Sequence, residues 1–399
     1  MKWFAAWPKG VPLLLVNSFL MSVGFYALIP NLSVYLTHVL QWSPLLAGIL
    51  LMVRQFGQQG PMMLTGMIAD RVGYRATLSI GFLIRGIGFA MFAFNTSVVW
   101  IFLSAMVAGI GGSLFEPTGD AALATLTDES SRSRTYAVKK VSDNLGMVFS
   151  ALIGTLLVSV SFRLLSLVCG AVFVLAGLLT YFRLPSIQVQ VKPMPWRHMW
   201  GTVSRDKPFI HFVAVMVGYF FMYMQLYLTI PDRVVEMTNK ASSVSIVFLT
   251  LSVMMILFQV PINTMVSKYN AILTVQWGLL SMGGGLFLFG LSNSIWVLLV
   301  GIILFSVGVM TVQPASFDVT SQLSDPKLTA TYFGFYYLAM AIGGALSQGT
   351  GGLLLQVGAA IGVPSLVWWV AGAVAVLSAA GAGPLREALL RHRESQVQS

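Results

Sequence analysis

Charged residues interrupt several long apolar stretches of this chain, in which only 9% of all residues are charged. A charged side chain is expensive inside a membrane and usually serves a function there. A carboxylate beside a cation can lose and regain a proton as its surroundings change. Proton exchange is therefore the chemistry that this set supports. Its members are Arg54, Arg85, Glu116, Asp120, Lys139, Lys140, Asp143 and Asp318.

Glu116 is the first candidate for a proton carrier, and it shares a helix face with Asp120 because the two are four residues apart. Asp143 is a further candidate. Arg54 or Arg85 could be the cation that pairs with the ionised acid. The alternative is that these acids and the neighbouring lysines form a structural ion-pair network near the membrane surface.

A second group of residues with chemical potential lies at 66–75, between two apolar stretches. Gly73 provides the backbone freedom for a tight turn, and Gly66 permits close contact between helices. Asp70 is placed to meet a helix N-terminus or an arginine. Alternatively, this is an ordinary turn in which Arg71 and Arg75 only set the orientation in the membrane.

The chain as a whole is too apolar for a soluble protein. Its 399 residues are 57% hydrophobic with a mean hydropathy of +0.82, whereas about 25% of the residues in a soluble domain are charged. The net charge of +10 could suit nucleic acid, but the basic residues fall in alternate loops, as in membrane proteins. A lipid bilayer is therefore the expected partner, and nucleic acid is not. The single cysteine, Cys169, excludes internal disulfides.

Enzymatic patterns are not recognisable in the sequence. The four histidines are scattered without a metal-binding spacing, and the glycines of residues 81–88 and 283–285 lie inside apolar stretches, where they favour helix packing. We therefore expect no metal, no cofactor and no enzymatic activity.

Twelve apolar stretches are long enough to cross a bilayer core of about 30 Å, which predicts an all-α integral membrane protein. Lys and Arg residues number sixteen in one set of alternate loops and three in the other, which predicts that both termini are cytoplasmic. The predicted spans are residues 11–37, 42–69, 76–95, 98–124, 135–158, 164–182, 208–231, 242–266, 271–291, 295–322, 328–356 and 363–385.

The longest loop, residues 183–207, contains prolines and basic residues and is predicted to be a cytoplasmic linker. It separates two six-helix halves, residues 1–182 and 208–385, and a cytoplasmic tail follows at 386–399. Within the linker, the stretch from Trp196 to Trp200 predicts a short amphipathic helix on the membrane surface.

The two halves repeat each other in sequence. Trp100 and Trp296 begin corresponding spans, and Glu116-Pro117 corresponds to Gln313-Pro314. Parallel six-span repeats suit a transporter with a central site.

Residues 66–75 resemble the G-x-x-x-D-R-x-G-R/K-R/K loop of the major facilitator superfamily, with Tyr74 where a basic residue is usual. The resemblance to the superfamily covers essentially the whole chain. The first half is also similar to the MdtH-like branch of bacterial drug:proton antiporters, in residues 54–60, 85–89 and 109–117. Two features of many proton-coupled members are missing. Ala105 lies where an arginine is expected, and the fifth-span motif keeps Gly146 and Gly154 without its proline.

The resemblance implies a bacterial inner-membrane transporter whose halves rock to open a central cavity to each side in turn. Asp70 would face the start of the eleventh span, near residues 328–330, and Arg71 and Arg75 could pair with Asp128 or Glu129. The implied function is proton-coupled efflux of small amphiphilic drugs or metabolites. The alternative is a proton-coupled or facilitative carrier of one specific metabolite. We expect a monomer whose partners are protons and a small-molecule substrate.

Aromatic residues are the predicted lining of the substrate cavity, because flat amphiphilic molecules bind such surfaces. Packing inside the membrane is the alternative role for each of them. Pro30 and Pro231 are predicted kinks at equivalent positions. Asp318 is either a helix cap or a contact for a cationic substrate. The candidates for substrate contact are Arg54, Arg85, Tyr26, Tyr219, Tyr223, Tyr227, Asp318, Tyr336 and Tyr337.

Overall fold

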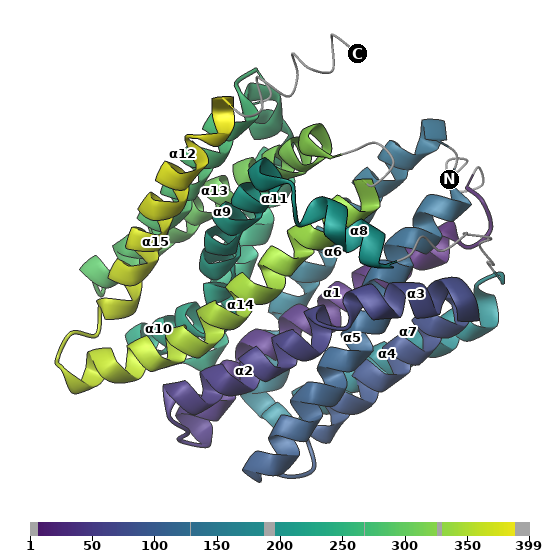
Figure 1. Ribbon diagram of the computed structural model, residues 1–399. Helices are drawn as coiled ribbons and strands as arrows, with labels where there is room; N and C mark the ends of the chain where they lie inside the picture. The colour runs from purple at the N-terminus through teal and green to yellow at the C-terminus, as the bar shows by residue number, and fades with distance from the viewer. Residues whose placement is uncertain (1–6, 128, 187–195, 267, 325–328, 388–399) are drawn as a thin grey trace. The chain divides into compact units, whose positions relative to one another are not determined.

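The computed structural model describes residues 7–127, 129–186, 196–266, 268–324 and 329–387. The regular structure in these ranges is helical, which confirms the predicted all-α fold (Figure 1). The chain divides into two compact units. The first comprises Met1–Trp42, Ile49–Lys192 and Val234–Ser252, and the second comprises Ser43–Gly48, Pro193–Arg233 and Val253–Ser399.

The first unit is built from the helices of the N-terminal part of the chain, including most of α2. Helix α1 continues into a short π-helical segment, η2. The elements are α1 (Val11–Val34), η2 (Tyr35–Val39), α2 (Pro44–Gln59), α3 (Met62–Val72), α4 (Tyr74–Met91), α5 (Val98–Leu126), α6 (Glu129–Val160) and α7 (Phe162–Arg183).

The second unit holds most of the remaining helices, while α10 and α11 are divided between the units and the short η4 lies in the first unit. The elements are α8 (Trp196–Val203), α9 (Lys207–Tyr223), η3 (Met224–Tyr227), α10 (Thr229–Thr238), η4 (Ala241–Ser243), α11 (Val244–Val266), α12 (Ala271–Leu291), α13 (Ile295–Leu323), α14 (Thr329–Ala360) and α15 (Leu366–Ala382).

The two units use the same helix pairings. In the first unit α1 packs on α6 and α7, and α4 packs on α5 and α7. In the second, α9 packs on α14 and α15, and α12 packs on α13 and α15. Helices α5 and α13 are both 29 residues long and carry an internal proline, Pro117 or Pro314, at the same distance from the end. This agreement supports the repeat predicted from the sequence.

Ten helical stretches of the described residues are long and apolar enough to cross a membrane, which is consistent with the twelve predicted spans. The predicted spans at 42–69 and 76–95 are not among these ten. The first is interrupted at Gly60 and Pro61, between α2 and α3. The second is α4. Charged and amide residues, such as Arg54, Gln58 and Arg85, make both stretches less apolar.

The predicted span at 208–231 is a broken helix. Helix α9 ends at Tyr223, a 3-10 turn occupies Met224–Tyr227, and α10 starts at Thr229. The break therefore precedes Pro231, which lies in the first turn of α10, where proline is tolerated. Pro30 lies inside α1, which continues to Val34.

The predicted linker helix is present as α8, which packs on α14. The rings of Trp200 and Phe335 lie 4.7 Å apart. The Tyr332 hydroxyl donates a hydrogen bond of 2.8 Å to Asp206, whose side chain also caps the start of α9 by accepting from the Phe209 amide. The end of the linker is therefore fastened to the second unit.

Close packing of helices depends on particular glycines, and α12 offers a direct comparison. A Cβ added to Gly285 would lie 2.8 Å from the backbone nitrogen of Phe305 on α13 and closer still to the carbonyl of Gly301. A Cβ added to the adjacent Gly284 would meet nothing within 4 Å. The two neighbours thus differ in packing while sharing one helix.

We expect Gly285→Ala to lower the free energy of unfolding by about 1–3 kcal/mol, because the added methyl forces α12 and α13 apart. Gly284→Ala is the matched control and should not lower it. Thermal unfolding of the two purified variants in one detergent is the measurement. Equal losses of stability in both variants would contradict this account of the contact.

Candidate functional site

Gln58 connects charged residues from three helices of the first unit. Its Oε1 accepts hydrogen bonds from Arg54 Nη1 (2.8 Å) on α2 and from Arg85 Nη2 (3.5 Å) on α4. Its Nε2 donates to Glu116 Oε1 on α5 at 2.8 Å. Both arginines are buried, with 1% of their surface exposed. One amide therefore joins a carboxylate to two guanidinium groups.

Aromatic rings enclose the guanidinium of Arg85. Its Cζ lies 4.9 Å from the ring centre of Phe25, 5.2 Å from that of Phe115, 5.3 Å from that of Phe173 and 5.4 Å from that of Phe89. Attraction between a cation and the face of a ring is strongest where water is excluded. Rings from α1, α4, α5 and α7 thus help to hold a charge inside the unit.

Glycines on α5 make room for this arrangement. A Cβ added to Gly112 would lie 2.5 Å from Nη1 of Arg85 and 3.1 Å from Cγ and Cδ of Gln58. A Cβ added to Gly109 would lie 2.5 Å from the carbonyl oxygen of Arg54. Gly112 and Glu116 are four residues apart, so the space and the carboxylate lie on one helix face.

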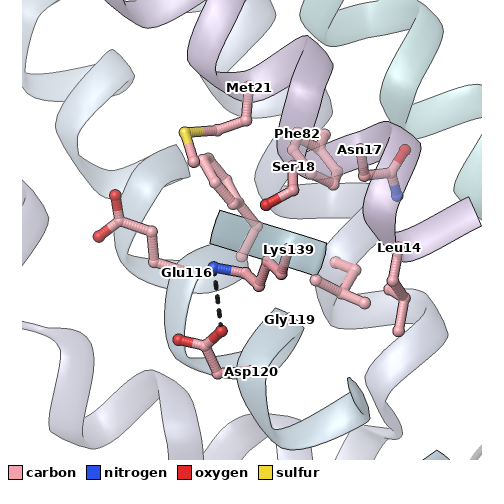
Figure 2. Close-up of a pocket in the computed structure, with 11 residues that line it drawn as sticks. Leu14, Asn17, Ser18, Met21, Phe82, Glu116, Gly119, Asp120 and Lys139 are labelled. Atoms are coloured by element: carbon pink, nitrogen blue, oxygen red, sulfur yellow. Dashed lines mark ion pairs between the residues drawn. The ribbon is translucent and has the colours of Figure 1, made fainter. Parts of the chain in front are cut away.

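A second charged cluster lies on α5 and α6 of the same unit. Lys139 Nζ lies 3.3 Å from Asp120 Oδ1 and 3.5 Å from Asp143 Oδ2. Ser18 on α1 donates a hydrogen bond to Asp143 Oδ1 at 2.5 Å. Figure 2 shows the ion pair between Lys139 and Asp120, with Glu116 on the same helix as Asp120. Lys139 therefore joins Asp120 and Asp143, two of the acids that the sequence suggests as proton carriers.

A small cavity lies between the two clusters. It is bordered by Glu116, Asp120 and Lys139, and by uncharged residues of α1 and α4 (Figure 2). Its volume is about 70 Å³, enough for a few water molecules but well below the roughly 300–1,000 Å³ of a site for a drug-sized ligand. Water and protons fit this cavity, and a whole drug molecule does not.

The structure brings most of the charged candidates together. Glu116 lies with Arg54 and Arg85, while Asp120 and Asp143 share Lys139. Lys140 and Asp318 are exposed.

Sequence reasoning did not identify Gln58 or Ser18 as site residues. The available signal for Gln58 was its position four residues after Arg54, on the same helix face. Ser18 gave no comparable signal.

The turn at residues 66–75 is partly described. Gly73 has a φ of +95°, so the predicted need for glycine is confirmed at this position. Arg71 is exposed, and the guanidinium carbon of Arg75 lies 5.9 Å from the ring centre of Tyr181. The side chain of Asp70, the neighbourhood of Gly66, and the proposed partners Asp128, Glu129 and residues 328–330 lie outside the described side chains.

Four of the aromatic candidates gather in the second unit. Tyr219, Tyr223 and Tyr227 follow one another along α9 and η3, with ring centres 6.0 and 6.5 Å apart. Tyr336 on α14 shares a hydrogen bond of 2.9 Å with Ser316. Tyr337 is exposed on the same helix. In the first unit, Tyr26 packs edge-on against Phe25, one of the rings around Arg85.

An all-helical chain with two similarly packed units and charged residues buried within its spans is built like a secondary transporter. The sequence pattern of the Major Facilitator Superfamily matches residues 14–348. The chain therefore belongs to the Major Facilitator Superfamily, which makes it a multi-pass membrane transporter and not an enzyme.

Bacterial multidrug resistance proteins are among the relatives of this chain. The chain is 30% identical over 366 residues to multidrug resistance protein MdtH of Proteus mirabilis, covering 92% of each protein. It is 31% identical over 364 residues to MdtH of Cronobacter sakazakii, covering 91% of this chain and 90% of that protein. The resemblance to the MdtH-like branch is thereby confirmed.

Solved structures of other transporters share the fold. The crystal structure of a point mutant of the nucleoside transporter NupG matches with a TM-score of 0.81 over 94% of this chain and 99% of that one, at 14% identity. A bacterial homologue of the human lysosomal transporter Spinster matches with a TM-score of 0.77 over 96% and 97% of the two chains, at 12% identity.

We expect Gly112→Ala to reduce transport at least about tenfold, because its methyl group would displace Arg85 and Gln58 from Glu116. Gly284→Ala on α12 is the control, since its added Cβ would meet nothing within 4 Å. Transport is measured in proteoliposomes, after both variants are shown to be folded by size-exclusion chromatography. Similar transport by the two variants would show that the contacts of Gln58 and Arg85 are dispensable.

Proposed function

We propose that this transporter exports small amphiphilic compounds in exchange for protons, by alternating access. The main observation behind this proposal is the position of Glu116, whose carboxylate is hydrogen-bonded to Gln58 beside two buried arginines. The names of the relatives, multidrug resistance proteins, support the substrate class. We further propose that both termini are cytoplasmic, that the linker 183–207 joins the two halves, and that the protein is a monomer in the inner membrane.

Proton exchange requires an acid that is neutral in one state and ionised beside a cation in another. Glu116 is suited to this requirement, because Gln58 bridges it to Arg54 and Arg85 and because it borders a cavity large enough for water. The Gln58 carboxamide contacts both kinds of charge, because its oxygen accepts from the arginines and its nitrogen donates to Glu116. A change in the charge of Glu116 therefore alters the contacts that hold α2, α4 and α5 together.

The cargo is assigned to a different set of residues. The cavity beside Glu116 is too small for a drug-sized molecule, whereas Tyr219, Tyr223, Tyr227 and Tyr336 form an aromatic cluster in the second unit, in which Tyr219, Tyr227 and Tyr336 are buried. Aromatic rings bind flat amphiphilic molecules because the contact removes apolar surface of both partners from water. We propose that the first unit handles protons and that these tyrosines contribute to the substrate surface.

Glu116→Gln combined with Asp120→Asn should abolish substrate movement driven by a pH gradient, because neither side chain can then release a proton. The measurement is uptake into inside-out vesicles with and without an imposed gradient. Glu236→Gln, which changes an exposed acid of α10, should retain the gradient-driven rate.

Transport by the wild type that is indifferent to the gradient would contradict proton coupling. It would favour the second candidate, a facilitative carrier of one metabolite. Persistence of gradient-driven transport in the double variant would instead exclude these two acids as the proton carriers.

Asp70 is proposed to act at the cytoplasmic gate, by pairing with the positive end of a helix dipole. Removing its charge should weaken that closed state, so Asp70→Asn should reduce turnover several-fold, on the scale of about 1 kcal/mol for such an interaction. Substrate affinity and unfolding temperature should stay near those of the wild type. Unchanged turnover would argue against a gating role for Asp70.

A further inference from the structure

What we term the amide cluster comprises four buried polar side chains on adjoining helical segments of the second unit: Gln225, Thr229, Ser347 and Gln348. Each has at most 1% of its surface exposed. Gln225 and Thr229 lie at the break between α9 and α10, and Ser347 and Gln348 lie in the middle of α14, which packs on both α9 and η3. Gly351, one turn after Ser347, brings α14 against the side chains of Gln225 and Thr229.

Within the described structure, several polar atoms of the amide cluster have no hydrogen-bond partner. They are Nε2 of Gln225, Oγ of Ser347, and both Oε1 and Nε2 of Gln348. The Thr229 hydroxyl donates to Gln225 Oε1 at 2.5 Å and also lies 3.3 Å from the backbone carbonyl oxygen of Gln225. A buried donor or acceptor without a partner is destabilising, and an apolar residue of the same size would avoid this cost.

The break in the helix adds an independent indication. Discontinuous membrane helices in secondary transporters carry binding sites near the middle of the bilayer, where the backbone leaves the regular helical pattern. Gln225 lies inside such a break, since the 3-10 segment Met224–Tyr227 interrupts the span Lys207–Thr238. Unpartnered side chains and an interrupted helix therefore coincide at one place.

We propose that the amide cluster is a recognition subsite for uncharged hydrogen-bonding groups of the substrate, such as an amide, carbonyl or hydroxyl. Carboxamides both donate and accept, so they match neutral polar groups of this kind. This inference rests on the proposed transport function and adds to it a preference for part of the cargo. The tyrosines bind the flat body of the molecule, and the amide cluster binds its polar substituent.

The test compares two probes at equilibrium, so that its outcome does not depend on proton coupling. Chloramphenicol is uncharged and carries an amide and hydroxyl groups, whereas tetraphenylphosphonium is aromatic and has no hydrogen-bonding group. Binding of each to the purified full chain is measured by isothermal titration. We expect Gln225→Leu and Gln348→Leu to weaken chloramphenicol binding about tenfold or more, and tetraphenylphosphonium binding less than about threefold.

Unfolding temperature separates recognition from a structural role. Gln348→Leu should leave this temperature unchanged or raise it, because it removes unpartnered polar atoms. Gln276→Leu is the matched control and should lower it, since Gln276 Nε2 donates a 2.8 Å hydrogen bond to the carbonyl of Ala379. Gly351→Ala gives a second route, because its methyl would lie 3.4 Å from Gln225 Oε1 and cover the amide without removing it.

Three results would overturn the amide cluster as a subsite. These are equal weakening of both probes, unchanged chloramphenicol binding in both leucine variants and in Gly351→Ala, or a loss of stability in Gln348→Leu equal to that in Gln276→Leu. Tetraphenylphosphonium binding without any chloramphenicol binding by the wild type would overturn it as well. Transport that ignores a pH gradient, with both binding preferences intact, would instead refute proton coupling and leave the subsite standing.

Discussion

Holding two guanidinium groups inside an apolar helix bundle is the constraint on which the first unit depends. A charge in hydrocarbon costs several kcal/mol unless nearby groups stabilise it. The structure surrounds Arg85 with four phenylalanine rings and lets Gln58 accept from both Arg54 and Arg85. These contacts are possible because Gly112 has no side chain. The proposed proton site is thus a consequence of how the unit accommodates its positive charges.

The second unit repeats the helix pairings without repeating the charges. Gly308 on α13 packs against Met282 of α12, just as Gly111 on α5 packs against Arg85 of α4. Methionine thus takes the place of the arginine, and uncharged residues of α13 take the places of the two acids of α5. A duplicated scaffold has therefore come to hold ion pairs in one unit and neutral amides and tyrosines in the other. This difference supports separate roles for the units in coupling and in substrate recognition.

Hydropathy was sufficient to predict the helices, because the bounds of long apolar spans follow from composition. The prediction for α12, residues 271–291, matches the structure at both ends. The break at Gly60–Pro61 was missed although Gly-Pro is a local helix breaker. The kink predicted at Pro231 falls in the preceding turn, Met224–Tyr227, where a proline disturbs the helix. The charged candidates were found because charge is rare in this chain. Gln58 was missed because a neutral amide becomes important only through partners on other helices.

Residues that make a transporter work need not be those that stabilise it. Val309 occupies on α13 the position that Gly112 occupies on α5, and it is buried with 1% of its surface exposed. A side chain there fills space in the second unit, whereas the first unit leaves that space to Arg85 and Gln58. Filling it would improve apolar packing and remove the link between the arginines and Glu116. The glycine is therefore best understood as a requirement of the charged site, retained at the expense of a better-packed helix contact.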